Sequence, residues 1–167
     1  MFKINVDKIL TDVLSDKSIN FAPGYKIEVE DKMNFFTKLS LGIAEFSAPP
    51  FAIALANDEG VKGIIIFREA INYIWKVICK FPKICAICKW EFGGKEAILK
   101  KILKEYLIHE SRHTHQYEWL KNHGISLNSV GKQNLKIKYW LRPMEIDAYL
   151  YQAGIKLPIS WLISLYK

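Results

Sequence analysis

Hydrophobic and polar positions follow two periods along this chain, and together they predict a mostly helical α+β fold. Apolar residues recur at helical spacing over residues 3–16, 33–46, 68–80, 95–123 and 143–153, and a short apolar piece follows over residues 159–166. Residues 25–30 alternate as a half-buried strand does, and two strand-like runs, 51–56 and 61–67, flank an Asn-Asp-Glu-Gly turn typical of a β-hairpin. We therefore expect a single domain over residues 1–167, with a small antiparallel sheet packed on the helix over 95–123.

The stretch between the last two long helices has a weaker pattern. Residues 125–141 suggest a loop, and the alternation over 135–140 is compatible with a strand. Pro143 then opens the next helix, at a position where its missing N–H has no cost. We expect no regular helix between Gly124 and Pro143.

The helix expected over residues 95–123 has histidines on its inward face. One helical stripe contains Ile98, Ile102, Tyr106, His109, His113, Gln116 and Leu120. Gly124 follows the helix as a C-terminal cap. Because most of the stripe is apolar, the two imidazoles are expected to point toward the core.

Residues 109–113 have the sequence His-Glu-Ser-Arg-His, which fits the H-E-x-x-H signature of zinc hydrolases. Histidines at i and i+4 share one helix face, so His109 and His113 can hold one metal ion, and Glu110 can take a proton from the metal-bound water. A catalytic zinc site also needs a third protein ligand. The carboxylates of Glu145 and Asp147, on the next helix, are the best placed for this role.

Two further histidines leave a third imidazole ligand formally open. His115 falls on the far side of the helix and is expected at the surface, whereas His123 lies on the ligand stripe but at the helix end. The residues after the motif do not continue with the x-x-G-x-x-H that supplies a third histidine in metzincins. This difference argues for a carboxylate ligand.

The segment from Leu107 to Tyr151, with HESRHTHQ followed by RPMEIDAYLYQ, resembles zincin metallopeptidases of the Glu-ligand (gluzincin) type. These include small ImmA/IrrE-like peptidases, membrane-bound prenyl-protein proteases and small zincins of phages and mobile elements. In several such families the third ligand begins an E-x-x-A-[Asn/Asp] pattern. Glu145 and Ala148 match it, but Tyr149 stands where Asn or Asp usually supports a ligand histidine. Another group is therefore expected to orient that imidazole.

The resemblance implies a zincin-like peptidase with one Zn²⁺ per chain, bound by His109, His113 and Glu145. Asp147 stays the alternative third ligand, and Glu110 would act as the general base. A second donor to the substrate carbonyl is expected among Tyr139, Arg142, Tyr149 and Tyr151.

The resemblance also implies how a peptide or protein substrate would bind. In the zincin layout an extended peptide adds to the edge strand of the sheet. Two segments are candidates for that strand, residues 51–56 and residues 61–67, of which the second is the more strand-like.

The formal net charge of +7 comes mainly from lysine, since arginine occurs only at positions 68, 112 and 142. Dispersed, solvated lysines explain such a charge, and so does a surface that attracts nucleic acid or an anionic membrane. The lysines and aromatics of residues 75–104 are the candidate face. They lack an arginine cluster and a recognised nucleic-acid-binding fold.

The three cysteines, Cys79, Cys85 and Cys88, include one C-x-x-C pair among apolar residues. Buried core thiols are expected, although a redox pair, half of a zinc site or a disulfide stay open. The first residues are charged where a signal peptide needs an apolar run, and no stretch has the length and apolarity of a membrane span. We therefore expect a soluble intracellular protein.

Three hypotheses for function follow from the sequence. The first is a zinc-dependent peptidase. The second is a zincin fold that binds metal but has become an inactive interaction module, as the departure at Tyr149 would allow. The third is a basic protein that binds nucleic acid or a membrane surface and carries the motif by accident.

Overall fold

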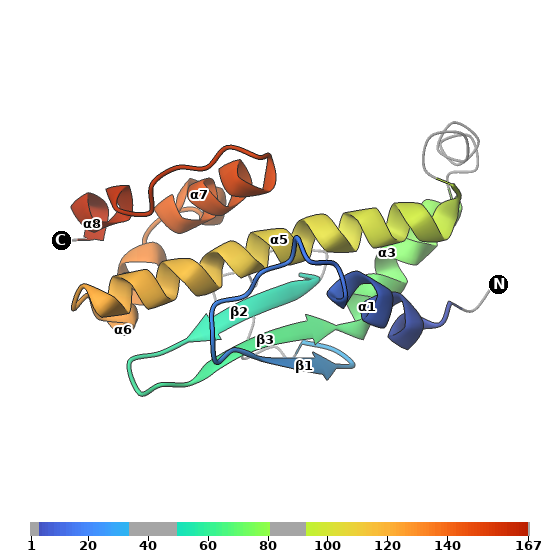
Figure 1. The fold of residues 1–167 in the computed structure, drawn as a ribbon, viewed down its shortest axis with the longest axis horizontal. Coiled ribbons are helices and arrows are strands. Elements are labelled where there is room, and N and C mark those ends of the chain that lie inside the picture. Colours follow the sequence, from blue (N-terminus) through green and yellow to red (C-terminus); the bar gives the residue numbers. More distant parts are fainter. Residues whose placement is uncertain (1–3, 34–49, 81–92, 167) are drawn as a thin grey trace.

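The computed structural model describes residues 4–33, 50–80 and 93–166, in which helices pack around a small sheet (Figure 1). In chain order the elements are α1 (Val6–Leu14), β1 (Lys26–Glu30), β2 (Ala52–Ala56), β3 (Lys62–Phe67), α3 (Arg68–Lys80), α5 (Lys95–Asn122), α6 (Leu127–Asn134), the 3-10 turn η1 (Tyr139–Leu141), α7 (Pro143–Gln152) and α8 (Trp161–Tyr166). The expected α+β fold with mostly helical content is confirmed. The helix expected over residues 33–46 falls almost wholly outside the described residues.

The β-hairpin is confirmed, with β2 and β3 antiparallel and Ala54 opposite Ile64. Its turn is closed by Asn57, whose N–H donates to Val61 O at 3.2 Å and whose Oδ1 accepts from Val61 N at 2.9 Å. Gly60 has φ +95°, a left-handed conformation that favours glycine. The turn residues therefore fix the hairpin locally.

The sheet is mixed, so the expectation of a purely antiparallel sheet is wrong. The strand order is β1-β3-β2, and β1 runs parallel to β3. Parallel strands need a long connection, and residues 31–61, which include β2, separate β1 from β3 in the sequence. The strand β1 is also more exposed than its alternation suggests, with Ile27 40% and Val29 38% exposed.

The helix α5 is the longest element, with 28 residues, a length of about 42 Å at the usual helical rise. Its first half packs on the sheet, α1 and α3 through Leu99, Leu103 and Leu107. Its last turns join a second apolar cluster with α6, α7 and α8. Between these two cores, buried residues 109–114 and 116 are all polar or charged. Figure 1 shows α5 crossing the whole molecule between the sheet and α7.

The helix α6 was not expected, and the loop with a strand over 135–140 is wrong. Two acceptors cap this helix: Ser126 Oγ accepts from Ser129 N, and Asp58 of the hairpin turn accepts from Leu127 N at 2.7 Å and from Ser126 Oγ at 2.6 Å. Leu127 and Val130 are buried. Beyond α6, Leu135 and Ile137, which alternate with lysines, are exposed, so the alternation marks no buried strand face.

Two further expectations can be compared with the structure only in part. Within the described part of the chain, every helix is too short or too polar to cross a lipid bilayer. Cys79 is a half-buried free thiol, whereas Cys85 and Cys88 lie outside the described residues.

Leu107 tests the placement of α5 on the sheet, because its side chain is fully buried two residues before the H-E-x-x-H motif. We expect Leu107→Ala to lower the free energy of unfolding by about 2–5 kcal/mol, as large-to-small core changes do. Chemical denaturation measures this loss. The control Val61→Ala, at a residue 57% exposed, should change stability by about 0.5 kcal/mol or less. Equal effects of the two variants would contradict the packing described above.

Candidate metal centre

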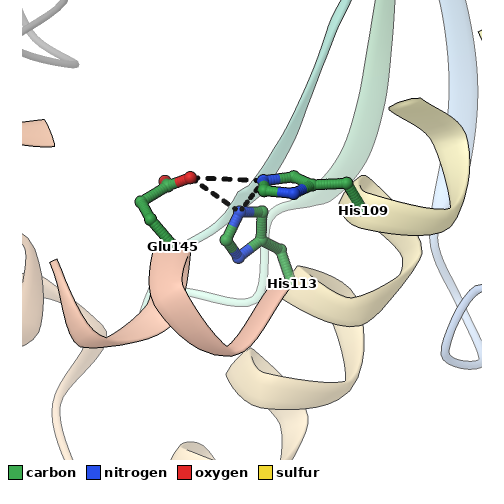
Figure 2. A group of neighbouring side chains, drawn as sticks. All are labelled: His109, His113 and Glu145. Atoms are coloured by element: carbon green, nitrogen blue, oxygen red, sulfur yellow. Dashed lines mark hydrogen bonds and ion pairs between the residues drawn. The ribbon is translucent and has the colours of Figure 1, made fainter. Parts of the chain in front are cut away.

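His109, His113 and Glu145 converge on one point between α5 and α7 (Figure 2). The two imidazoles come from successive turns of α5, and their Nε2 atoms are 3.2 Å apart. Glu145 lies in the first turn of α7, which Pro143 opens. Its Oε2 lies 3.2 Å from His109 Nε2 and 3.5 Å from His113 Nε2. The structure thus brings together the three residues expected to be ligands.

The triangle of donor atoms fits a tetrahedral metal ion. Tetrahedral zinc with nitrogen and oxygen ligands at about 2.0–2.1 Å places neighbouring ligand atoms about 3.3 Å apart. The observed separations of 3.2, 3.2 and 3.5 Å lie close to that value. All three side chains are buried, and imidazole and carboxylate are typical zinc ligands. These side chains therefore fit a divalent cation such as Zn²⁺.

Electrostatics within the group favour a cation at its centre. Burial alone would lower the pKa of His113, but the charge and hydrogen bond of Glu145, with Glu110 and Gln116, raise it to about 9. Burial alone would raise the pKa of Glu145, but His113 and His109 hold it well below its usual range. The carboxylate thus stabilises positive charge at this point, whether a proton or a metal ion supplies it.

The two imidazoles have different surroundings. His113 Nδ1 lies 2.7 Å from Gln116 Oε1, within hydrogen-bond distance. Among the described residues, His109 Nδ1 has no hydrogen-bond partner. The ring of Tyr149 instead packs on the ring of His109, with centroids 4.5 Å apart and an interplanar angle of 57°. Tyr149 thus contacts a histidine through its ring, where Asn or Asp would have supplied a polar atom.

Glu110 lies beside the group and also contacts the sheet. Its Oε2 accepts a hydrogen bond of 2.7 Å from Ala54 N on β2. Burial raises the pKa of Glu110, although His113, His109 and the Ala54 N–H oppose that rise. A buried carboxyl with a raised pKa next to a metal site is suited to exchanging a proton near neutral pH.

Asp147, the alternative third ligand, faces a different set of partners. It accepts from Arg112 Nε at 2.6 Å, from Arg112 Nη2 at 3.0 Å and from Gln116 Nε2 at 2.6 Å, and it is fully buried. His115 contacts Asn20 O at 2.9 Å, and His123 contacts Trp119 O at 2.8 Å. Asp147, His115 and His123 therefore all lie outside the group formed by His109, His113 and Glu145.

A cavity of about 680 Å³ contains the group and is lined by β2. Its lining includes β2, the three candidate ligands, Glu110 and part of α6. Because β3 pairs with a strand on each side, β2 is the strand that presents an edge to this cavity among the strands that the structure describes. The preference for residues 61–67 as the edge strand is therefore wrong, and residues 51–56 provide it.

The four candidate donors to a substrate carbonyl separate by position. Tyr139, Arg142 and Tyr149 line the cavity, whereas Tyr151 packs under the Arg112 guanidinium, with the Arg112 Cζ 4.9 Å from its ring centroid. Burial and the neighbouring Glu145, to which Tyr139 is hydrogen-bonded, raise the pKa of Tyr139 far above its usual value. Its hydroxyl therefore stays protonated and lies beside a candidate ligand.

Sequence reasoning gave no role to several residues around the site. Gln116 was identifiable, since it lies on the same helical stripe three residues after His113. Arg112 occupies a variable position of the motif, and Tyr117, whose hydroxyl donates to Ala54 O at 3.4 Å, follows no recognisable pattern. Arg112 contacts α7 and the segment before α8, and Tyr117 contacts β2. These contacts depend on tertiary packing, so the local sequence does not indicate them.

The expected basic face over residues 75–104 is described only in part, because residues 81–92 lie outside the described residues. Two of its lysines form ion pairs with α1 and the turn after it, Lys100 with Asp12 at 2.6 Å and Lys104 with Asp16 at 2.7 Å. Binding of nucleic acid or of an anionic membrane stays a prediction from charge.

Comparisons of this chain with protein-family models, with curated proteins and with solved structures found no significant match.

Loss of the Glu145 carboxylate tests the metal centre. We expect the wild type to bind one Zn²⁺ per chain and Glu145→Gln to bind it more than about 100-fold more weakly, because removing a ligand costs more than removing a residue that orients one. Competition with a chromophoric chelator measures the affinity. The matched control is Glu118→Gln on α5, where the carboxylate pairs with Lys62 instead. Unchanged affinity in Glu145→Gln would contradict this ligand set.

Proposed function

We propose that this protein is a zinc-dependent peptidase with His109, His113 and Glu145 as the metal ligands. The observation that carries the proposal is the convergence of these three side chains beside Glu110 and the edge of β2, all in one cavity. A structural zinc site is closed by four protein ligands, whereas a catalytic site uses three. Three ligands on the wall of a cavity favour catalysis over a structural role.

Zn²⁺ bound there supplies Lewis acidity, which makes a water molecule more acidic and polarises a carbonyl group. Glu110 accepts the proton of the attacking water and delivers it to the leaving amine. Two features support this role: its pKa is raised by burial, and its carboxylate is fixed by the Ala54 N–H. A fixed base loses less entropy when the transition state forms.

The proposed substrate is an extended peptide that pairs with β2. The N–H and C=O of Ala54 contact Glu110 and Tyr117, so both groups are directed away from β3 and toward α5. Glu110 and Tyr117 occupy these two groups, so a peptide strand would pair with the other outward-facing backbone groups of the same edge, which recognise it independently of its sequence. The apolar residues Leu127 and Val130 on α6 also line the cavity and would contact a substrate side chain.

Tyr139 is the donor that we propose for the substrate carbonyl. Its hydroxyl is buried, stays protonated and hydrogen-bonds to Glu145, which places it next to the reacting atoms. Negative charge that develops on the carbonyl oxygen is best stabilised by a donor already held in a site of low polarity. Tyr151, on the far side of Arg112, lacks this position.

One observation favours a second candidate, a metal-binding interaction module without hydrolysis. His109 Nδ1 has no hydrogen-bond partner among the described residues, so one ligand is less firmly oriented than in a fully supported site. The cavity and the edge of β2 would then bind a peptide without cleaving it.

The variant Glu110→Gln distinguishes the two candidates. For a peptidase, we expect it to keep Zn²⁺ and to lower the cleavage rate of unfolded casein or a peptide library by about 10²–10⁴-fold, because the general base is lost. Mass spectrometry detects the products, and Glu118→Gln is the control. Full activity in Glu110→Gln would contradict the proposed base. Zinc binding with no cleavage by the wild type would favour the interaction module.

The variant Tyr139→Phe tests the proposed donor. We expect kcat to fall by about 10²–10³-fold with little change in KM, since the hydrogen bond acts in the transition state. Steady-state kinetics on a cleaved peptide measures both constants. Tyr151→Phe, which keeps the ring under Arg112, serves as the control. A rise in KM alone would assign Tyr139 to substrate binding.

A further inference from the structure

Gln116 makes three hydrogen bonds that connect a candidate ligand to the helix opposite. Its side chain is fully buried, one turn after His113 on α5. The Oε1 atom lies 2.7 Å from His113 Nδ1. The Nε2 atom donates to Met144 O at 3.0 Å and to Asp147 Oδ2 at 2.6 Å, both on α7. Every polar atom of the amide is therefore engaged.

These contacts allow only one orientation of the Gln116 amide. Met144 O can only accept a hydrogen bond. Both oxygens of Asp147 accept hydrogen bonds from Arg112, which can only donate, so Asp147 is an acceptor here too. A flipped amide would place its oxygen against both acceptors in a buried site, at the cost of unsatisfied polar groups. The amide oxygen must therefore face His113.

The fixed amide in turn determines which ring nitrogen of His113 carries the proton. An amide oxygen accepts, so His113 Nδ1 must be the donor. The neutral ring then has its lone pair on Nε2, the atom that faces His109 Nε2 and Glu145 Oε2. This is the tautomer that can bind a metal ion through Nε2. His109 has no comparable partner among the described residues.

We propose that Gln116 is the positioning residue of the metal site, held in place by Asp147 and Arg112. The inference rests on the proposed metal-dependent function. The same amide fixes the tautomer of His113 and the position of α7, because its acceptors, Met144 and Asp147, flank Glu145. Arg112 extends the connection, since its Nη2 also donates to Leu157 O at 2.8 Å in the segment before α8. One buried network thus sets the separation of ligands from two helices.

Zinc affinity measured by chelator competition tests this role with Gln116→Leu, which removes the amide at similar side-chain size. We expect affinity to fall by about 10–100-fold, the usual effect of losing a residue that orients a ligand. The control is Thr114→Val, which removes buried hydrogen bonds of the same helix, to Ala22 N and Ser111 O, without contact to His113. Thermal unfolding of the metal-free proteins measures how far each variant is destabilised.

The outcomes separate this inference from the proposed function. A loss of affinity in Gln116→Leu with affinity within about twofold of wild type in Thr114→Val supports the positioning role. Equal affinity in wild type and Gln116→Leu overturns it and leaves the metal site intact. No zinc binding by the wild type overturns the proposed function and the inference with it.

A measurement on the wild type tests whether Gln116 fixes the tautomer of His113, even if the Gln116→Leu variant does not fold. In the ¹⁵N-histidine spectrum of the zinc-loaded protein, we expect His113 to coordinate through Nε2 and to show an exchange-protected Nδ1–H proton. The Nδ1–H of His109 should exchange with solvent faster. Coordination of His113 through Nδ1, or rapid exchange of its Nδ1–H, would overturn the proposal.

Discussion

The structure depends on the polar segment in the middle of α5, which is buried although its residues would prefer water. Residues 109–114 and 116 lie between two apolar clusters of the same helix. Burying such groups is unfavourable unless each finds a partner. The partners come from three directions: Ala54 on β2, Asp147 and the Met144 carbonyl on α7, and Leu157 O before α8. The surrounding elements therefore lie where they can supply hydrogen-bond partners to the buried polar side chains of α5.

Charge within the segment is arranged in two sets. Asp147 and Arg112 form a buried pair with two hydrogen bonds, which balances one negative and one positive charge. Glu110 and Glu145 form the second set, beside the imidazoles of His109 and His113. A divalent cation bound by neutral imidazoles would balance these two carboxylates. The two sets explain why Asp147 of α7 is bonded to Arg112, whereas Glu145 of the same helix is available to a metal ion.

The parts of the site that local geometry determines could be predicted from the sequence. A spacing of four residues in a helix places His109 and His113 on one face, and the turn residues of the hairpin act within five positions of the chain. The choice between Glu145 and Asp147 required the partner of each carboxylate, and Arg112 lies 35 residues before Asp147. The helix α6 has one local signal, its N-cap Ser126, but its second capping acceptor, Asp58, is separated from Leu127 by 69 positions. Nothing in the local sequence indicates that β1 runs parallel to β3.

The contact of Asp58 with the start of α6 has a consequence for the cavity. The hairpin turn continues directly from β2, which lines the cavity, and its carboxylate holds the start of α6, a helix that also lines it. These two lining elements are therefore joined by the same short turn. Their spacing depends on the length of that turn, so we expect a single inserted residue there to change the shape of the cavity while leaving His109, His113, Glu145 and Glu110 untouched.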